Sequence, residues 1–167
     1  MTVLHQTEDL FNLHRLNNEL VYYTVNPHDT SRNLYFVSDV PHLLKTTRNC
    51  FSNSQSHKNT RRLWKDGKDI SWLHLIRLIE EHCELDLYNP CPKLTRGHID
   101  MTAFSYMKVN LAAQILSDTV ANALEELYDE QVSGTVNFIR NMNNFFDCMN
   151  VRSLFEGRNK RNPNLDP

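Results

Sequence analysis

The sequence predicts an α+β protein in which a short mixed α/β region precedes a mainly α-helical one. Two strand-like runs before residue 40 and a helical spacing of apolar residues from residue 70 onward are the main observations. The 167 residues suffice for one domain or for parts of two. Apolar residues make up 40% and charged residues 23%, a balance typical of a chain that buries a core rather than of a disordered one.

The first region, residues 1–52, contains the strand-like runs. EDLFNLHRL at residues 8–16 is typical of the end of a short helix. VYYTV at 21–25 and NLYFVS at 33–38 are rich in β-branched and aromatic residues, and the turn-forming NPHD lies between them. The second run is nearly all apolar, which predicts a strand buried on both faces.

Asp39 directly follows this second run, and a helical stretch, LLKTTRNCF, begins just after Pro41. A carboxylate at the end of a buried strand can bind a divalent metal ion, and two such ions about 4 Å apart support phosphoryl transfer. The same carboxylate can instead cap the following helix. The local pattern alone favours the cap, and nothing in the composition locates partner carboxylates.

The second region begins after a polar loop at residues 52–60. LWKDGKDISW at 63–72 carries Asp66-Gly67 at its centre, which predicts a β-hairpin. Apolar residues then recur at helical spacing from Trp72 to about His82, and two prolines between residues 88 and 92 end that helix.

Two longer helices are predicted next, each from an apolar stripe at 3.6-residue spacing. One runs from about Thr102 to Tyr128 and the other from about Glu130 to Met149. After Val151 the chain becomes basic and polar, which is typical of a linker or an interrupted end.

The net charge of −2 is unusual for a free-standing DNA-binding domain, which is normally basic. Nonspecific affinity for nucleic acid is therefore expected to be weak unless cations cluster locally. No apolar run approaches the roughly 20 residues that cross a bilayer, and the N-terminus lacks the pattern of a signal peptide. We therefore expect an intracellular protein with no membrane partner.

The four cysteines, Cys50, Cys83, Cys91 and Cys148, include no CxxC pair. This favours free thiols in a reducing compartment over a disulfide framework. Zinc binding by His82, Cys83 and Cys91 is an alternative, although their spacing fits no common zinc finger.

The stretch YFVSDVPHLLKTTRNCF at 35–51 resembles the signature that follows a central strand of the RNase H-like catalytic domain in P-element-type DNA transposases and the related THAP-domain proteins. In that family the aspartate of the DxPHLxKxxRN motif is the second member of an acidic catalytic triad. The resemblance implies that Asp39 is a catalytic and metal-binding residue. The other matching residues, expected to serve helix packing or DNA-backbone contact, are His42, Lys45, Arg48 and Asn49.

The segments PKLTRGHIDMTAFSYMKVNLAAQILSDTVANAL (92–124) and FFDCMNVRSLFEGRNKRNP (145–163) resemble the insertion domain of the same family. The resemblance implies a partial RNase H-like catalytic domain at 1–60, followed by a mainly α-helical, GTP-binding insertion domain at 61–167. The family's first catalytic aspartate, its final glutamate, its zinc-binding THAP module and its coiled coil have no match in these residues. We therefore expect that this chain does not cut DNA by itself.

The family's insertion domain binds GTP as a cofactor for assembly on DNA. The sequence has no GxxxxGK[ST] and only four glycines, so a GTP site here has to be built from side chains on helices. Phe146 and Asp147 match the positions of base stacking and guanine recognition. The matching positions around the nucleotide are Lys93, Lys108, Val109 and Ser117. The alternative is that the apolar members are core and the lysines are solvated.

The leading hypothesis is a segment of a nuclear P-element-like transposase. In the complete protein it would cleave and transfer DNA strands with Mg²⁺ or Mn²⁺, act on transposon-end DNA, use GTP as assembly cofactor, and oligomerise through regions outside this chain. One alternative is a domesticated, noncatalytic helical module that binds nucleotide or protein. Another is an incompletely predicted gene whose missing strands are encoded next to it.

Overall fold

A computed structural model describes residues 23–35, 39–54, 61–83 and 89–150 of the chain. The contacts divide the chain into two compact units, residues 1–38 and 39–167, which are described separately below. The helix expected at 8–16 and the basic tail after Val151 lie outside the described residues. No described helix is both long and apolar enough to cross a membrane.

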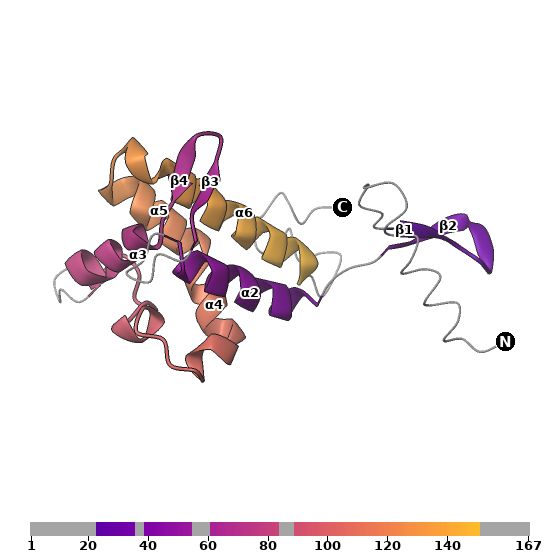
Figure 1. Cartoon of the computed structure of the whole chain (residues 1–167), viewed down its shortest axis with the longest axis horizontal. Coiled ribbons are helices and arrows are strands. Elements are labelled where there is room, and N and C mark those ends of the chain that lie inside the picture. The colour runs from indigo at the N-terminus through magenta and orange to yellow at the C-terminus, as the bar shows by residue number, and fades with distance from the viewer. Residues whose placement is uncertain (1–22, 36–38, 55–60, 84–88, 151–167) are drawn as a thin grey trace. The chain divides into compact units, whose positions relative to one another are not determined.

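In the first unit, β1 (Tyr23–Asn26) and β2 (Asp29–Tyr35) form an antiparallel hairpin (Figure 1). The side chain of Asn26 accepts a 3.0 Å hydrogen bond from the backbone N–H of His28, which stabilises the predicted turn. The rings of Tyr23 and Tyr35 face each other across the strands at 5.8 Å. A hairpin is therefore present at the predicted place, but its second strand starts at Asp29, inside the predicted turn.

The expected burial of the second strand is wrong for the residues described. All seven residues of β2 are exposed, and the strand runs mainly through the polar DTSRN segment instead of the apolar run at 33–38. Residues 36–38, which complete that run, lie outside the described residues. Within the described ranges the hairpin pairs with no third strand, so neither of its edges is extended by a sheet partner.

The second unit is a helical body with one small hairpin (Figure 1). Short 3₁₀ turns occupy Arg96–His98, Ser105–Met107 and Glu130–Val132. The remaining elements, in chain order, are α2 (Val40–Ser52), β3 (Leu63–Lys65), β4 (Lys68–Ile70), α3 (Trp72–Leu78) with a π-helical continuation over Ile79–Cys83, α4 (Val109–Ile115), α5 (Asp118–Leu127) and α6 (Ser133–Met149).

The core of this unit joins α2 to the helices that follow it. The ring of Phe51 meets the ring of Trp72 edge-on at 5.0 Å and lies 5.2 Å from the ring of Phe138. Leu44 on the same helix is also fully buried. Helix α2 thus packs inside the helical unit, and the contact boundary at Ser38/Asp39 differs from the domain boundary expected near residue 60.

The predicted hairpin at 63–72 is confirmed. Asp66 and Gly67 both have positive φ, 53° and 75°, as the two central residues of a tight β-hairpin turn require. Strand β4 packs directly on the first turn of α6. A Cβ atom at Gly134 would lie 2.5 Å from the carbonyl oxygen of Asp69, so only glycine allows this close approach.

The single long helix expected from Thr102 to Tyr128 is wrong. The chain forms a 3₁₀ turn and then α4, and it leaves helical geometry at Leu116 and Ser117 before α5 begins. The hydroxyl of Ser117 donates a 2.8 Å hydrogen bond to the carbonyl of Gln114, which helps to end α4. Met107, an apolar residue within the expected helix, is 67% exposed. The helix expected over 130–149 is confirmed as a 3₁₀ turn followed by α6.

Candidate functional site

Asp39 stands immediately before α2 and caps it. One carboxylate oxygen accepts a 2.9 Å hydrogen bond from the backbone N–H of His42, and Pro41 occupies the first turn of the helix. Within the described ranges there is no group of three or more histidine, cysteine or acidic side chains that could hold a metal ion. The geometry therefore accounts for Asp39 as a helix cap, and its metal-binding role stays a prediction.

Arg48, one turn from the end of the same helix, is fully buried. Its Nη2 donates to the backbone carbonyls of Ser105 and Tyr106, each at 3.1 Å, and its Nε donates to the side chain of Asn49 at 2.8 Å. The guanidinium also lies 5.8 Å from the ring centre of Tyr106. Of the two roles expected for Arg48, the structure supports helix packing, because a buried guanidinium cannot contact a DNA backbone.

The contacts of Arg48 bear on the predicted nucleotide residues, because the turn it holds leads directly into Lys108 and Val109. Burial lowers the pKa of the guanidinium, and Nη1 has no hydrogen-bond partner among the described residues. A buried cation held mainly by carbonyl oxygens is sensitive to any change in the turn that supplies them. Arg48 therefore couples α2 to the start of α4.

Lys108 and Val109 open helix α4. The Lys108 side chain is exposed, and its Nζ lies 4.6 Å from the ring centre of Phe104, a cation–π distance. Val109 is half-buried and packs against the core. The half-buried valine and the exposed lysine fit the alternative of a core valine and a solvated lysine, and a role of either residue in nucleotide binding stays a prediction.

Lys93 and Ser117 line a common cavity of about 270 Å³. Its wall also includes Cys91, Leu94 and Gln114. Lys93 is exposed at the rim, while Cys91 and Leu94 form a buried apolar floor. Two of the six residues predicted to surround the nucleotide are thus brought together by the fold.

Phe146 and Asp147 lie in the last turns of α6. Phe146 is half-buried and packs against the core, whereas Asp147 accepts a 3.1 Å hydrogen bond from the amide of Asn143. The amide oxygen of Asn143 accepts in turn from the backbone N–H of Asp118 at 3.2 Å. This chain of bonds ties Asp147 to the start of α5, directly after Ser117.

Sequence reasoning missed Asn143. Its position one helical turn before Asp147 was the available signal, because side chains four residues apart lie on the same face of a helix. The structure thus groups Ser117, Asn143 and Asp147 around the start of α5. A carboxylate can accept hydrogen bonds from the N1–H and exocyclic amine of guanine, and lysines such as Lys93 can neutralise phosphates.

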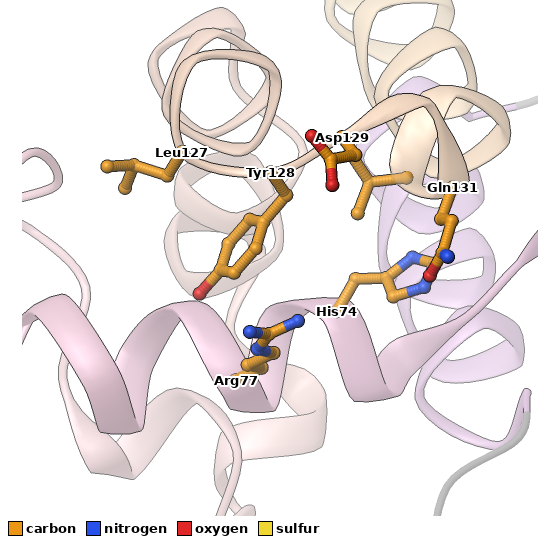
Figure 2. Close-up of a pocket in the computed structure, with 7 residues that line it drawn as sticks. His74, Arg77, Leu127, Tyr128, Asp129 and Gln131 are labelled. Carbon is orange, nitrogen blue, oxygen red and sulfur yellow. The ribbon is translucent and has the colours of Figure 1, made fainter.

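A separate pocket, of about 170 Å³, lies between α3 and the α5–α6 connection. Figure 2 shows His74 and Arg77 coming from α3 and Tyr128, Asp129 and Gln131 from the connection. The Arg77 guanidinium lies 4.6 Å from the ring centre of Tyr128, and both side chains bond to Glu81. No sequence pattern singled out these residues.

His74 on the other side of this pocket is tied to the core. Its Nδ1 lies 2.8 Å from the hydroxyl of the fully buried Thr135, which also accepts a 3.0 Å hydrogen bond from the backbone N–H of Ser71. Burial is the main cause that lowers the pKa of His74, with the positive charge of Arg77 as a second cause. These bonds join the start of α3 to α6, so His74 and Thr135 have a structural role where the two helices meet.

The family described as "TNP-like, GTP-binding insertion domain" matches residues 41–162. The human protein "DNA transposase THAP9" is 31% identical over 150 residues, which cover 84% of this chain and 15% of that protein. The Drosophila melanogaster "Transposable element P transposase" is 29% identical over 132 residues, which cover 76% of this chain and 16% of that protein.

A solved structure, "Drosophila P element transposase strand transfer complex", superposes with a TM-score of 0.69 at 25% identity. The match covers 87% of this chain and 32% of that chain. The chain therefore spans about 15% of the length of the curated relatives it matches.

Proposed function

The chain belongs to the TNP-like, GTP-binding insertion domain family, and from this premise we propose that it is a segment of a P-element-type DNA transposase whose helical unit binds GTP. The observation that carries the proposal is the family match over residues 41–162, which includes every described helix apart from Val40, the first residue of α2. In this proposal residues 61–167 form the insertion domain and residues 1–60 belong to the RNase H-like catalytic domain. Helix α2, which packs against α4 and α6, would then be the junction between the two domains.

The nucleotide would lie near the start of α5 and the end of α6. Phe146 would stack on the purine, and Asp147, oriented by Asn143, would accept hydrogen bonds from the guanine edge. Lys93 beside Ser117, and Lys108 at the start of α4, would neutralise the phosphates. Two hydrogen bonds support the proposal, because they link Asp147 through Asn143 to Asp118. Asp147 is the residue predicted to bind guanine, and Asp118 follows Ser117, which lines the same cavity as Lys93.

The described residues support a site for catalytic metal ions less than they support a site for GTP. A two-metal site needs several carboxylates. Within the described ranges, Asp39 belongs to no group of three or more histidine, cysteine or acidic side chains that could hold a metal ion. The residues present thus do not by themselves fit a Mg²⁺ or Mn²⁺ pair. We propose Asp39 as one ligand of such a site in the complete transposase, and we assign the nucleus and transposon-end DNA as the place and partner of that protein.

Isothermal titration calorimetry of the 167-residue chain with GTP and with ATP tests the proposal. We expect GTP to bind and ATP to bind at least tenfold more weakly, because adenine presents an acceptor at N1 to the Asp147 carboxylate. Asp147→Asn should lose this preference, and Phe146→Leu should weaken both nucleotides by removing the stacking ring. Asp100→Asn, an exposed carboxylate bonded to Arg96, is the matched control.

Two results would count against GTP binding at this site. One is equal affinity for GTP and ATP in the native chain, and the other is unchanged preference in Asp147→Asn. A chain that binds GTP specifically but never supports strand transfer, even when supplied with the flanking segments, would favour the noncatalytic binding module.

A further inference from the structure

Two lysines face each other at the tip of the β3–β4 hairpin. Lys65 and Lys68 are direct cross-strand partners, and both side chains are exposed. Like charges placed directly opposite each other on an antiparallel pair destabilise it, because the Cβ atoms of such partners lie only about 5 Å apart. The pairing therefore opposes the stability of β3–β4, a strand pair with only three residues in each strand.

Nothing described around the two lysines removes this repulsion. Neither ammonium group has an ion-pair partner among the described residues, and Asp69, which follows Lys68 on β4, bonds to Arg62 at 3.2 Å. Asp66 at the turn is the other carboxylate of the hairpin, so the tip carries two positive charges and one unpaired negative charge. The local excess is positive in a chain whose net charge is −2.

The lysines also border a cleft. The groove between the hairpin and α6 has a volume of about 400 Å³, and its polar lining residues are Lys65, Asp66, Lys68, Asn137 and Asn141, so two cations face one carboxylate there. The two asparagines are one turn apart on α6, so both amide groups lie on the face toward the hairpin. Ammonium and amide N–H groups are the donors that bind phosphate oxygens.

The hairpin is held firmly in this position. Gly134 brings the backbone of α6 against the carbonyl of Asp69, and the buried hydroxyl of Ser54 donates a 2.6 Å hydrogen bond to the carbonyl of Ile70. Figure 1 shows the hairpin standing against the first half of α6. The cleft is thus a fixed feature of the unit, and it lies toward the opposite end of α6 from Phe146 and Asp147.

We propose that this cleft is a second anion site, distinct from the nucleotide site, which binds the phosphodiester backbone of DNA. The inference rests on the proposed function in one respect, because a transposase segment works on DNA. Its physical basis is separate, since a bound phosphate would neutralise the opposed lysines and accept hydrogen bonds from Asn137 and Asn141. Contacts of this kind position a nucleic acid without reading its sequence.

The native chain offers a local reporter for this site. Trp64, next to Lys65, is 67% exposed, whereas the other tryptophan, Trp72, is 2% exposed in the core. A change in tryptophan emission upon DNA addition therefore reports on the hairpin. Binding is measured by this emission and by fluorescence anisotropy of a labelled duplex, over a series of salt concentrations.

The test compares the native 167-residue chain with Lys65→Gln/Lys68→Gln. We expect the double substitution to weaken DNA binding about tenfold at low salt and to reduce the slope of log affinity against log salt by about 1.8, the value for two lost phosphate contacts. The thermal midpoint should be unchanged or higher, because the like-charge pair is gone. Arg77→Gln/Arg96→Gln, which removes two exposed cations elsewhere, should leave the salt slope unchanged.

If both double variants reduce the slope of log affinity against log salt equally, the proposal is overturned. DNA binding would then depend on the net charge of the chain and not on the cleft. If inorganic phosphate displaces the duplex at matched ionic strength, the cleft is a free-phosphate site and the proposal is overturned. If polyglutamate binds as tightly as DNA, the cleft is an acidic-peptide site and the proposal is overturned as well. GTP calorimetry on the same variants separates the two proposals. Retained GTP binding with lost DNA binding supports the cleft, and absent GTP binding in every variant counts only against the nucleotide site.

Discussion

The carboxylate of Asp39 accepts a 2.9 Å hydrogen bond from the backbone N–H of His42, so the aspartate matched to a catalytic position is also the cap of α2. A cap needs only an oxygen acceptor, which asparagine and serine also provide. Metal binding needs the negative charge. The two roles therefore predict different responses to substitution.

Asp39→Ala should lower the free energy of unfolding of the chain by about 0.5–2 kcal/mol, the usual cost of a lost cap. Asp39→Asn should change it by only a few tenths of a kcal/mol. Urea unfolding followed by circular dichroism measures both. In a longer protein that supplies the remaining carboxylates, Asp39→Asn should abolish Mn²⁺-dependent cleavage, and unchanged cleavage there would exclude Asp39 from the metal site.

Arg48 gives a second prediction, because its guanidinium satisfies two backbone carbonyls of the turn before Lys108. Arg48→Met should destabilise the chain by about 2–4 kcal/mol, since it leaves the carbonyls of Ser105 and Tyr106 without their donor. Arg48→Lys keeps the charge but cannot reproduce the planar fork, and it should recover only part of the loss.

The effect of Arg48 on the nucleotide site is measured with Arg48→Lys under conditions where that variant is fully folded. We expect weaker GTP binding, because the turn that leads to Lys108 and Val109 loses its anchor. The matched comparison is Lys45→Arg on the same helix, which should alter neither stability nor GTP affinity. Native GTP affinity in folded Arg48→Lys would limit Arg48 to stability alone.

The close approach of β4 to α6 predicts a large effect from one methyl group. Gly134→Ala places a Cβ atom 2.5 Å from the carbonyl oxygen of Asp69, so the hairpin has to move. We expect a loss of about 1–3 kcal/mol, which outweighs the helix-propensity gain of up to about 1 kcal/mol from alanine. In the control, Gly97→Ala, the nearest atom is 3.6 Å away, and stability should stay nearly constant.

Local signals predicted the β3–β4 hairpin and helix α6 correctly. Asp66-Gly67 specifies a turn by its backbone conformation, and the stripe through Val136 and Ile139 reports a real buried face. The 3.6-residue spacing of apolar residues gave a wrong prediction between residues 102 and 128, where two helices form instead of one. Apolar spacing continues in phase across the end of α4, and only the Ser117-Asp118 pair, a helix-start signal, marks the break that places Ser117 in a cavity wall.

Features that depend on distant contacts were not accessible from the sequence. The burial of Arg48 depends on carbonyls 57 and 58 residues away, and the pairing of His74 with Thr135 spans 61 residues. Asn143 gained a role only because the fold places α5 beside α6. The family resemblance predicted Asp147 and Ser117 as nucleotide residues, whereas the hydrogen bonds that join Asp147 through Asn143 to Asp118 depend on packing.

His74 predicts how stability depends on pH. Burial and the charge of Arg77 lower the pKa of His74 in the folded state, so the unfolded chain binds a proton more readily at this position. The contribution of neutral His74 is therefore fully present above the unfolded pKa of about 6.5 and is lost as pH falls through the lower folded pKa. His74→Gln should flatten the decline in unfolding free energy below pH 6.5, as measured by urea titrations between pH 5 and 8. An equally steep decline in His74→Gln would assign the effect to other groups.

Cys91 offers a probe of the cavity that Lys93 and Ser117 line. Its thiol is 2% exposed, and burial is the main cause that raises its pKa to about 12, so little reactive thiolate exists at neutral pH. We expect a thiol reagent to label the exposed Cys148 at once and Cys91 only as fast as the unit opens. Mass spectrometry of digests resolves the two sites over time.

If GTP occupies this cavity, saturating GTP should slow labelling of Cys91 further through ligand stabilisation and leave Cys148 unchanged. Labelling of Cys91 at the same rate with and without GTP, in a chain that calorimetry shows to bind it, would mean that Cys91 is exposed by a local opening that the nucleotide does not restrain, and so would place the nucleotide outside this cavity.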